Sequence, residues 1–264
     1  MKMLLSLVKL IAIVYCVVCV VLYFMQERLL FFPEKLTPTH QFTFAANFEE
    51  MTITAKDSVR LNGLLFRADS SQGLIFYLHG NAGSLASWGD VASVFTALHY
   101  DVFMLDYRGY GKSEGKISSE QQLHADVQLA YDSLTARYGE KNIIVAGYSI
   151  GTGPATRLAA FNHPALLLLH APYYSLTDLA RHRFPFIPSF LLRYHLPLYK
   201  WLPACKMPVF IFHGDKDEVI YYGSSLKLQK LFKPSDKLMT LPEQQHNGIH
   251  DNATYLAALK KLLE

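Results

Sequence analysis

The sequence predicts one α/β domain, with a mostly parallel central sheet and helices on both faces, preceded by one transmembrane helix. Its 264 residues suit a single large domain. Short apolar runs alternate with longer helical patterns, which is typical of strands buried in a parallel sheet. These runs lie at residues 74–78, 102–105, 143–146, 166–169 and 209–212. A longer apolar stretch, residues 3–25, begins the chain and predicts the membrane helix.

Composition and charge restrict the class of protein further. Hydrophobic residues make up 51% of the chain and charged residues 18%, so a sizeable core can form. Without Lys2 and Lys9 the net charge falls from +3 to +1, and no basic run is present, so nucleic acid is not an expected partner. Cys16 and Cys19 lie in the apolar stretch and leave Cys205 alone. Neither a disulfide framework nor a zinc site is therefore expected.

Residues 1–25 are predicted to be an uncleaved membrane anchor. A spanning helix needs about 20 mainly apolar residues, and residues 3–25 provide them. A cleaved signal peptide and a buried core helix are the alternatives, but residues 23–28 lack the small side chains of a cleavage site. Lys2 and Lys9 lie at the amino-terminal end of the stretch, whereas the charges after it balance. A single-pass topology is expected, with a cytoplasmic amino terminus and the domain on the non-cytoplasmic side.

Residues 26–50 are interpreted as a linker and lead-in, and residues 51–264 as the domain. The domain begins with two strands, 51–56 and 60–67, which form an antiparallel pair at the edge of the sheet. Further on, the pattern predicts helices at about 84–98, 119–138, 151–162 and 220–232, a strand at 237–241 and a closing helix at 248–263. This alternation indicates right-handed crossovers between parallel strands.

Residues 173–206 interrupt the alternation between the strands at 166–169 and 209–212. They are rich in aromatic residues, proline and arginine, as in Phe184-Pro185-Phe186-Ile187-Pro188. Open α/β sheets bind ligands at the carboxyl ends of their strands. The stretch is therefore interpreted as a small lid that lines an apolar pocket, and an ordinary pair of connecting helices is the alternative.

Gly147-Tyr148-Ser149-Ile150-Gly151 follows the strand at 143–146 and precedes a helix. That context suits a nucleophile elbow, a sharp turn in which the serine is strained and a larger side chain two residues away on either side would clash. The helix after Ser149 would direct its amino-terminal N–H groups and dipole toward a developing oxyanion. Ser149 is therefore the candidate nucleophile, and a simple tight turn is the alternative.

A nucleophilic serine needs a base and an acid. With an elbow of this kind the order along the chain is serine, acid, histidine, so both partners are expected after Ser149, at the ends of later strands. Asp215 and Asp217 follow the strand at 209–212, and His246 and His250 follow the strand at 237–241. The spacing alone does not choose between the two aspartates or between the two histidines.

No cofactor or metal is expected. Gly111-Lys112-Ser113 ends like a phosphate-binding loop, but Asp106 stands where the first glycine belongs. Residues 151–156 begin like a dinucleotide fingerprint and lack its third small residue. His246 and His250 have the spacing of metal ligands on a helix, but no glutamate lies between them and no third ligand is evident.

Several motifs together resemble the α/β-hydrolase superfamily and follow its order. They are His79-Gly80-Asn81-Ala82-Gly83, the run from Asp106 to Ser113, the elbow at Ser149, His213-Gly214-Asp215-Lys216-Asp217, and His246-Asn247. From about Met51 onward the chain is similar to a membrane-anchored branch that includes depalmitoylating thioesterases and bacterial members grouped with the serine aminopeptidases. The resemblance implies an α/β-hydrolase fold.

It also implies roles for individual residues. Asp217 would be the acid, His246 the base, and the backbone N–H groups of Asn81 and Ile150 the oxyanion hole, while Asp215 would be a turn residue. The expected function is a membrane-anchored serine hydrolase that cleaves carboxylic ester or thioester bonds of acyl or lipid-like substrates through an acyl-enzyme. A serine peptidase of the aminopeptidase type, with the same triad, and a non-catalytic binding protein on a hydrolase fold are the alternatives. The expected partners are a small-molecule or acylated substrate and a membrane.

Overall fold

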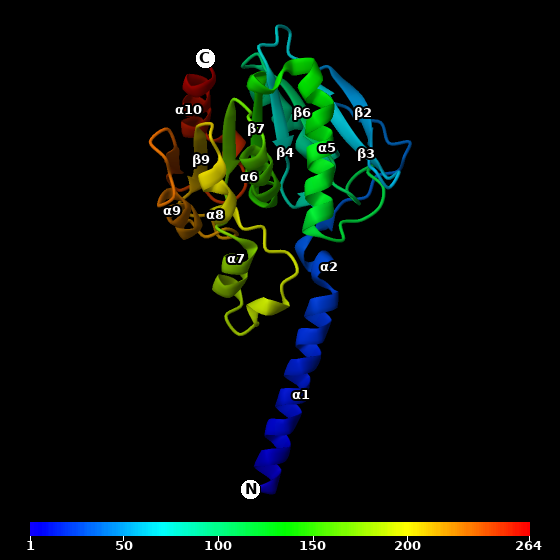
Figure 1. Cartoon of the computed structure of the whole chain (residues 1–264), viewed down its shortest axis with the longest axis vertical. Helices are drawn as coiled ribbons and strands as arrows, with labels where there is room; N and C mark the ends of the chain where they lie inside the picture. The colour runs from blue at the N-terminus through cyan, green and yellow to red at the C-terminus, as the bar shows by residue number, and fades with distance from the viewer.

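An eight-stranded sheet forms the centre of the domain in the computed structural model, which describes residues 1–264 (Figure 1). The strand order is β10-β9-β8-β7-β4-β6-β3-β2. The strands are β2 (Phe48–Thr54), β3 (Arg60–Phe66), β4 (Leu74–Leu78), β6 (Asp101–Leu105), β7 (Ile143–Tyr148), β8 (Leu166–His170), β9 (Val209–Gly214) and β10 (Lys237–Leu241). The strands from β10 to β6 run parallel, and β3 and β2 form the antiparallel edge that the sequence predicts.

Successive side chains of the buried strands point into two separate cores, one on each face of the sheet. In β4, Leu74, Phe76 and Leu78 belong to the core beneath helices α5 (Glu120–Tyr138), α6 (Thr152–Phe161) and α9 (Gly223–Gln229). Ile75 and Tyr77 belong to the core beneath α3 (Leu85–Trp88), α4 (Ala92–Thr96) and α10 (Ala253–Leu263). Burial on both faces explains why these strands are continuously apolar in sequence.

The helix boundaries differ from the expected ones where local geometry intervenes. The predicted helix at 84–98 is divided into α3, a 3-10 turn η1 (Gly89–Val91) and α4. A side chain at Gly89 would place its Cβ 2.3 Å from the ring of Phe44, so the lead-in segment packs directly on this break. The closing helix starts later than predicted, because the Asn252 side chain caps α10 by accepting the N–H of Tyr255.

Helix α1 (Lys2–Phe24) extends away from the domain and has no buried residue (Figure 1). Its 23 residues make it about 34 Å long at 1.5 Å per residue, which matches the hydrocarbon thickness of a bilayer. It is the one helix long and apolar enough to cross a membrane.

The segment expected to be a linker is folded against the domain. Helix α2 (Gln26–Leu30) follows α1 directly, and the side chain of Phe31 is buried. Strand β1 (Phe32–Pro33) then pairs in parallel with β5 (Ala82–Gly83). This segment therefore packs as part of the domain, next to the loop that contains Asn81.

The lid connects β8 to β9 in sequence. In space it lies beside the upper part of α1 (Figure 1). It comprises α7 (Leu176–Arg183), the 3-10 turn η4 (Ser189–Leu191), α8 (Leu198–Trp201) and a second 3-10 turn η5 (Leu202–Ala204). The Ser175 side chain caps α7 by accepting the N–H of Asp178. The lid, α2 and the carboxyl ends of the parallel strands thus meet on one side of the domain.

Candidate active site

Ser149 sits on a sharp turn between β7 and α6. Its φ of 51° lies in the left-handed region, which costs a non-glycine residue on the order of 1–3 kcal/mol. A Cβ on Gly147 would approach the Gly151 carbonyl oxygen to 2.6 Å, and one on Gly151 would approach the Leu78 carbonyl oxygen to 2.2 Å. Both positions therefore require glycine, as the elbow motif predicts.

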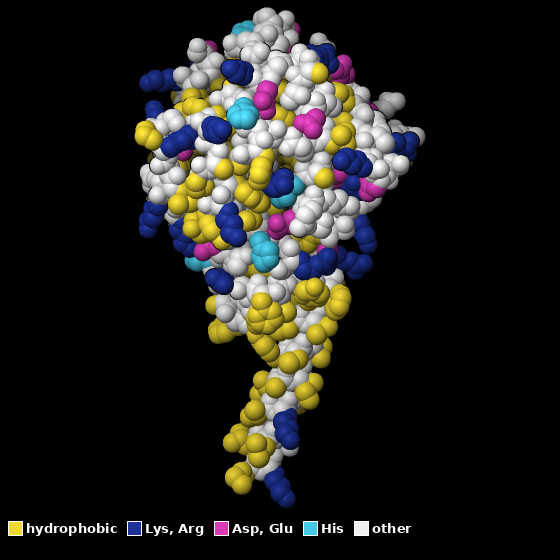
Figure 2. Space-filling model, viewed as in Figure 1, with side chains coloured by type: hydrophobic (Ala, Val, Ile, Leu, Met, Phe, Trp, Pro, Cys, Tyr) yellow, Lys and Arg dark blue, Asp and Glu magenta, His cyan; other side chains and the backbone are white.

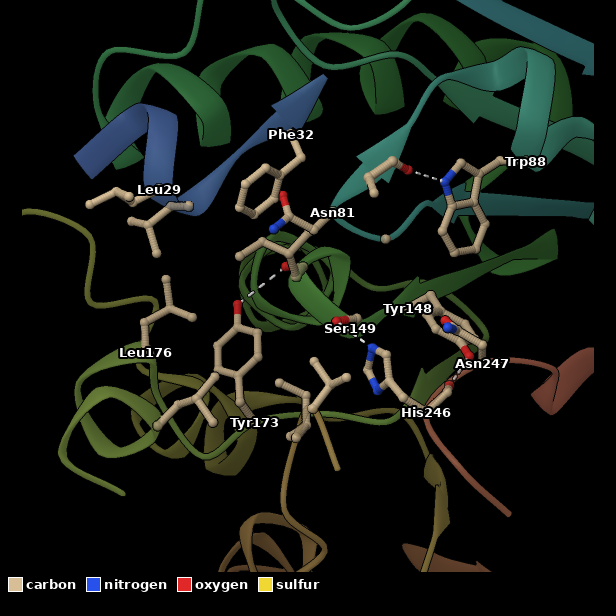
Figure 3. A pocket seen from close by; sticks show the side chains of 17 residues that line it. Leu29, Phe32, Asn81, Trp88, Tyr148, Ser149, Tyr173, Leu176, His246 and Asn247 are labelled. Carbon is tan, nitrogen blue, oxygen red and sulfur yellow. Dashed lines mark hydrogen bonds between the residues drawn. The ribbon is translucent and has the colours of Figure 1, made fainter. Parts of the chain in front are cut away.

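The structure brings Ser149, His246 and Asp217 into one hydrogen-bonded row (Figure 3 shows the first two). The Ser149 hydroxyl lies 3.1 Å from His246 Nε2, and His246 Nδ1 lies 2.7 Å from Asp217 Oδ2. Asp217 follows β9 and His246 follows β10, so the carboxyl ends of three strands supply the row. The arrangement allows the imidazole to accept the serine proton while the carboxylate receives the opposite N–H.

Asp217 is held in place from several directions. Its Oδ1 accepts the backbone N–H groups of Val219 and Ile220, each at 2.8 Å. His213 Nε2 lies 3.1 Å from Oδ2 and 2.9 Å from the Ile220 carbonyl oxygen. Both oxygens are acceptors, so Nε2 carries the proton, and Nδ1 accepts the Ser225 hydroxyl at 2.6 Å. Burial alone would raise the pKa of Asp217, but the hydrogen bonds from His213 and His246 hold that pKa well below its ordinary value.

The sequence does not predict the support from His213, which belongs to the motif around Asp217 and has no role of its own there. The sequence signal is a histidine at the end of a buried strand, four residues before Asp217. The structure shows that its side chain is fully buried.

The alternative acid and base do not contact Ser149. Asp215 Oδ1 accepts the N–H of Glu243 at 2.8 Å and so holds the turn between two loops. His250 is buried, with its Nε2 3.3 Å from the hydroxyl of Tyr77. Burial lowers the pKa of His250 well below its ordinary value, so this imidazole is neutral. The geometry therefore favours Asp217 and His246.

Asn81 and Ile150 line the same pocket as Ser149. The Asn81 N–H has no hydrogen-bond partner within the chain, and the Asn81 carbonyl oxygen accepts the hydroxyl of Tyr110 at 2.7 Å. Ile150 lies in the first turn after Ser149, where N–H groups are not used by a preceding helical turn. Both residues thus lie in the pocket with Ser149, and their role as an oxyanion hole stays a prediction.

A buried pair lies next to the Asn81 loop. Asp106 Oδ1 accepts the N–H of Leu85 at 3.0 Å, and burial raises the pKa of Asp106 to about 7. His79 Nε2 lies 3.7 Å away, and burial lowers the pKa of His79 to about 4. A Cβ on Gly111 would come within 1.9 Å of the Asp106 carboxyl, so the motif from Asp106 to Ser113 folds tightly on this group. The motif from Asp106 to Ser113 therefore has a structural role.

The pocket above Ser149 has a volume of about 290 Å³ and is mainly apolar. Twelve of its 17 lining residues are hydrophobic, and none is Asp, Glu, Lys or Arg. Leu176, labelled in Figure 3, and Leu179 come from α7 of the lid segment. Leu29 and Phe32 come from α2 and β1, a contribution that the sequence did not predict. No group of three or more His, Cys, Asp or Glu side chains is arranged as the ligands of one metal ion.

Residues 69–203 match the family model described as serine aminopeptidase, S33. Alpha/beta hydrolase domain-containing protein aho-3 of Caenorhabditis elegans is 32% identical over 233 residues, which cover 85% of this chain and 68% of that protein. Human alpha/beta hydrolase domain-containing protein 17C is 34% identical over 217 residues, which cover 80% of this chain and 64% of that protein. The chain thus spans about two thirds of the length of these relatives.

Solved structures with the same fold include an esterase and a protein named Est1E. An esterase of Pyrococcus furiosus superimposes with a TM-score of 0.71 at 19% identity, over 89% of this chain and 96% of that one. Est1E from Butyrivibrio proteoclasticus, with ferulic acid bound, superimposes with a TM-score of 0.65 at 21% identity, over 81% and 96% of the two chains. At these identities the likeness concerns the fold, and it confirms the fold class that the sequence predicts.

Proposed function

Because this chain belongs to the α/β-hydrolase superfamily, we propose that it is a serine hydrolase that cleaves carboxylic ester or thioester bonds of acyl substrates and is held in a membrane by α1. The observation that carries the proposal is the row from Ser149 through His246 to Asp217, with contacts of 3.1 and 2.7 Å, at the floor of an apolar pocket.

In the first half of the reaction, Ser149 Oγ attacks the substrate carbonyl carbon while His246 Nε2 takes the hydroxyl proton. Asp217 stabilises the imidazolium through the Nδ1 contact. The N–H groups of Asn81 and Ile150 donate to the oxyanion of the tetrahedral intermediate. His246 then returns the proton to the departing alkoxide or thiolate, which leaves as an alcohol or thiol, and an acyl-Ser149 ester remains.

In the second half, His246 takes a proton from water, and the hydroxide attacks the acyl-Ser149 carbonyl. The tetrahedral intermediate collapses, His246 protonates Ser149 Oγ, and a carboxylic acid is released. Each step uses the same acid–base residue and the same oxyanion donors.

The lining of the pocket favours acyl substrates over peptides. A peptidase that trims from the amino terminus has to bind a free ammonium group, which a carboxylate would do. No Asp or Glu lines this pocket, whereas leucine, isoleucine, valine and aromatic side chains do. The ester or thioester activity is therefore proposed first, with the aminopeptidase activity as the alternative.

Labelling with a fluorophosphonate and comparison of two substrate classes test the proposal. We expect the full chain in detergent to be labelled at Ser149 and to hydrolyse p-nitrophenyl butyrate with a kcat/KM at least tenfold above that for aminoacyl p-nitroanilides. The Ser149→Ala variant is the labelling control. Faster cleavage of the aminoacyl amides would favour the peptidase alternative, and a folded protein without labelling would favour a non-catalytic role.

Tyr148 offers a test of how His246 is positioned. Its hydroxyl donates to the His246 carbonyl oxygen, and Tyr148 is buried. The Tyr148→Phe substitution is expected to lower kcat for ester hydrolysis by roughly 10- to 100-fold and to change KM little. The reason is that the backbone at His246 loses the hydrogen bond that helps to hold its imidazole in place. Steady-state kinetics measures the split.

Tyr77→Phe is the matched control for this experiment. The Tyr77 hydroxyl contacts His250, farther along the same connection between β10 and α10, and makes no hydrogen bond to His246 itself. Equal kcat values for Tyr148→Phe and the unmodified protein would contradict the positioning role.

A further inference from the structure

The tip of the lid exposes large apolar side chains. Phe186 and Phe190 are 85% and 82% exposed, and Phe184 is 63% exposed. Figure 2 shows hydrophobic side chains gathered where the lid meets α1, continuous with those of the helix. A contiguous cluster of large exposed apolar side chains marks a site of contact with another apolar phase or partner.

The tip lies beside α1, well inside the length of that helix. The Tyr15 hydroxyl donates to the Phe186 carbonyl oxygen at 2.8 Å. Tyr15 lies nine residues before Phe24, the end of α1, which corresponds to about 14 Å along the helix axis. A polar hydroxyl and a loop carbonyl that meet in hydrocarbon need partners within the protein, and here each satisfies the other.

Buried and ionic contacts fix the lid to the start of the domain. The buried Gln26 side chain donates to the Leu191 carbonyl oxygen at 2.7 Å and accepts the Arg193 N–H at 2.8 Å. Glu27 accepts the Tyr194 hydroxyl at 3.0 Å and forms an ion pair with Arg193 at 2.9 Å. Gln26 and Glu27 directly follow α1. The depth of α1 in a membrane therefore determines how deep the lid lies.

Basic residues directly precede the apolar tip in sequence. Arg181 and Arg183 lie at the exposed end of α7, immediately before Phe184. Such a sequence, with cations next to an apolar loop, suits the boundary between phosphate head groups and acyl chains.

The pocket is lined by elements from the same region. Leu29 and Leu30 of α2 form one wall, and Leu176 and Leu179 of α7 form another. These two helices are also the elements that join the domain to α1 and to the lid tip. The pocket volume of about 290 Å³ is at the low end of the roughly 300–1,000 Å³ typical of ligand sites. It suits the part of an acyl chain next to the carbonyl, while the rest of a long chain extends out of the mouth.

We propose that residues 184–191 insert into the lipid bilayer beside α1, so that the pocket mouth faces the hydrocarbon and receives the acyl chain directly from the leaflet. The occupant of the exposed surface is thus lipid, and the substrate is an acylated molecule that stays partly in the membrane. The inference rests on the anchor and the hydrolase activity of the proposed function.

Depth measurement by spin labelling tests the insertion without reference to activity. The full chain carrying Cys16→Ala and Cys19→Ala is labelled at Phe186→Cys or Phe190→Cys and reconstituted in phosphatidylcholine vesicles; Cys205 is buried and does not label in the folded protein. We expect oxygen to reach these labels several-fold more readily, and a water-soluble nickel complex several-fold less readily, than a label at Phe161→Cys. Phe161 is a matched exposed aromatic at the far end of α6.

A label at Val14→Cys in α1 separates the two proposals. If Val14→Cys lies in hydrocarbon while both lid labels are as accessible to nickel as Phe161→Cys, the insertion of the lid is overturned. If Val14→Cys is also in water, the anchor itself is overturned, and the inference with it.

Kinetics test the entry route. A triple variant with Phe184→Ser, Phe186→Ser and Phe190→Ser is expected to hydrolyse soluble p-nitrophenyl acetate within about twofold of the unmodified protein. It should lose at least tenfold on p-nitrophenyl palmitate dispersed in vesicles, whereas Phe161→Ser should change neither rate. An equal loss on both esters would overturn the route. If the unmodified protein cleaves neither ester, the hydrolase proposal fails, while the depth measurement still decides the insertion.

Discussion

Replacing Ser149 with alanine is expected to lower kcat for ester hydrolysis by on the order of 10⁶-fold, the largest effect of any single substitution in this chain. The serine, the base and the acid act as one unit, so removal of the nucleophile abolishes the acyl-enzyme route entirely. The residual rate would come from the oxyanion donors and from binding alone. Single-turnover hydrolysis of p-nitrophenyl butyrate at high enzyme concentration measures it.

The alanine variant should remain folded. Alanine keeps the Cβ at the strained φ of 51°, and the neighbouring turn is fixed by Gly147 and Gly151 rather than by the hydroxyl. Ser133→Ala serves as the matched control, because the Ser133 hydroxyl bonds only to the Ala130 carbonyl oxygen on α5. A Ser149→Ala protein that keeps more than about a hundredth of the original rate would contradict the nucleophile assignment.

The second large effect is expected from Asp217→Asn, which should lower kcat about 10⁴-fold. An amide at this position presents an N–H to His246 Nδ1 and favours the wrong tautomer of the imidazole. Asp215→Asn is the matched control, since its amide oxygen can still accept the Glu243 N–H. We expect Asp215→Asn to stay within a few fold of the unmodified protein, and the reverse order of effects would exchange the roles of the two aspartates.

Asp217 should also influence stability in acid. Its pKa is lower in the folded protein than in the unfolded chain, so its ionised form stabilises the fold. This contribution is fully present above about pH 4, the unfolded pKa, and is lost as pH falls toward the folded pKa. The unfolding free energy of Asp217→Asn should therefore decline less steeply below pH 4, as measured by denaturant titration.

The sheet and the elbow could be predicted because local sequence determines them. The apolar runs that become β4 and β7 are buried on both faces, and the two glycines around Ser149 are required by backbone atoms within 2.6 Å of their missing side chains. Both features leave a pattern that can be read from a few consecutive residues.

The rest of the site depends on contacts between distant segments. Asp215 and Asp217 are both carboxylates after the same strand, and only the fold of the loop, with the N–H groups of Val219 and Ile220 on Oδ1, turns Asp217 toward His246. The pocket wall at Leu29 comes from a stretch whose composition suggests a linker. Its place in the pocket depends on how α2 packs beside the lid, more than 140 residues away in sequence.

The two-residue pairing of β1 with β5 has a practical consequence for recombinant production. Glu34 N–H donates to the Gly83 carbonyl oxygen at 2.9 Å, and the Ser84 hydroxyl donates to the Glu34 carboxylate at 2.8 Å, so the chain leaving the membrane helix is attached beside the Asn81 loop. A shortened, water-soluble version that begins after residue 34 would lack the β1–β5 pairing, both Glu34 contacts and one side of the acyl pocket. Expression designs should therefore retain the sequence from Gln26 onward and remove only the membrane helix.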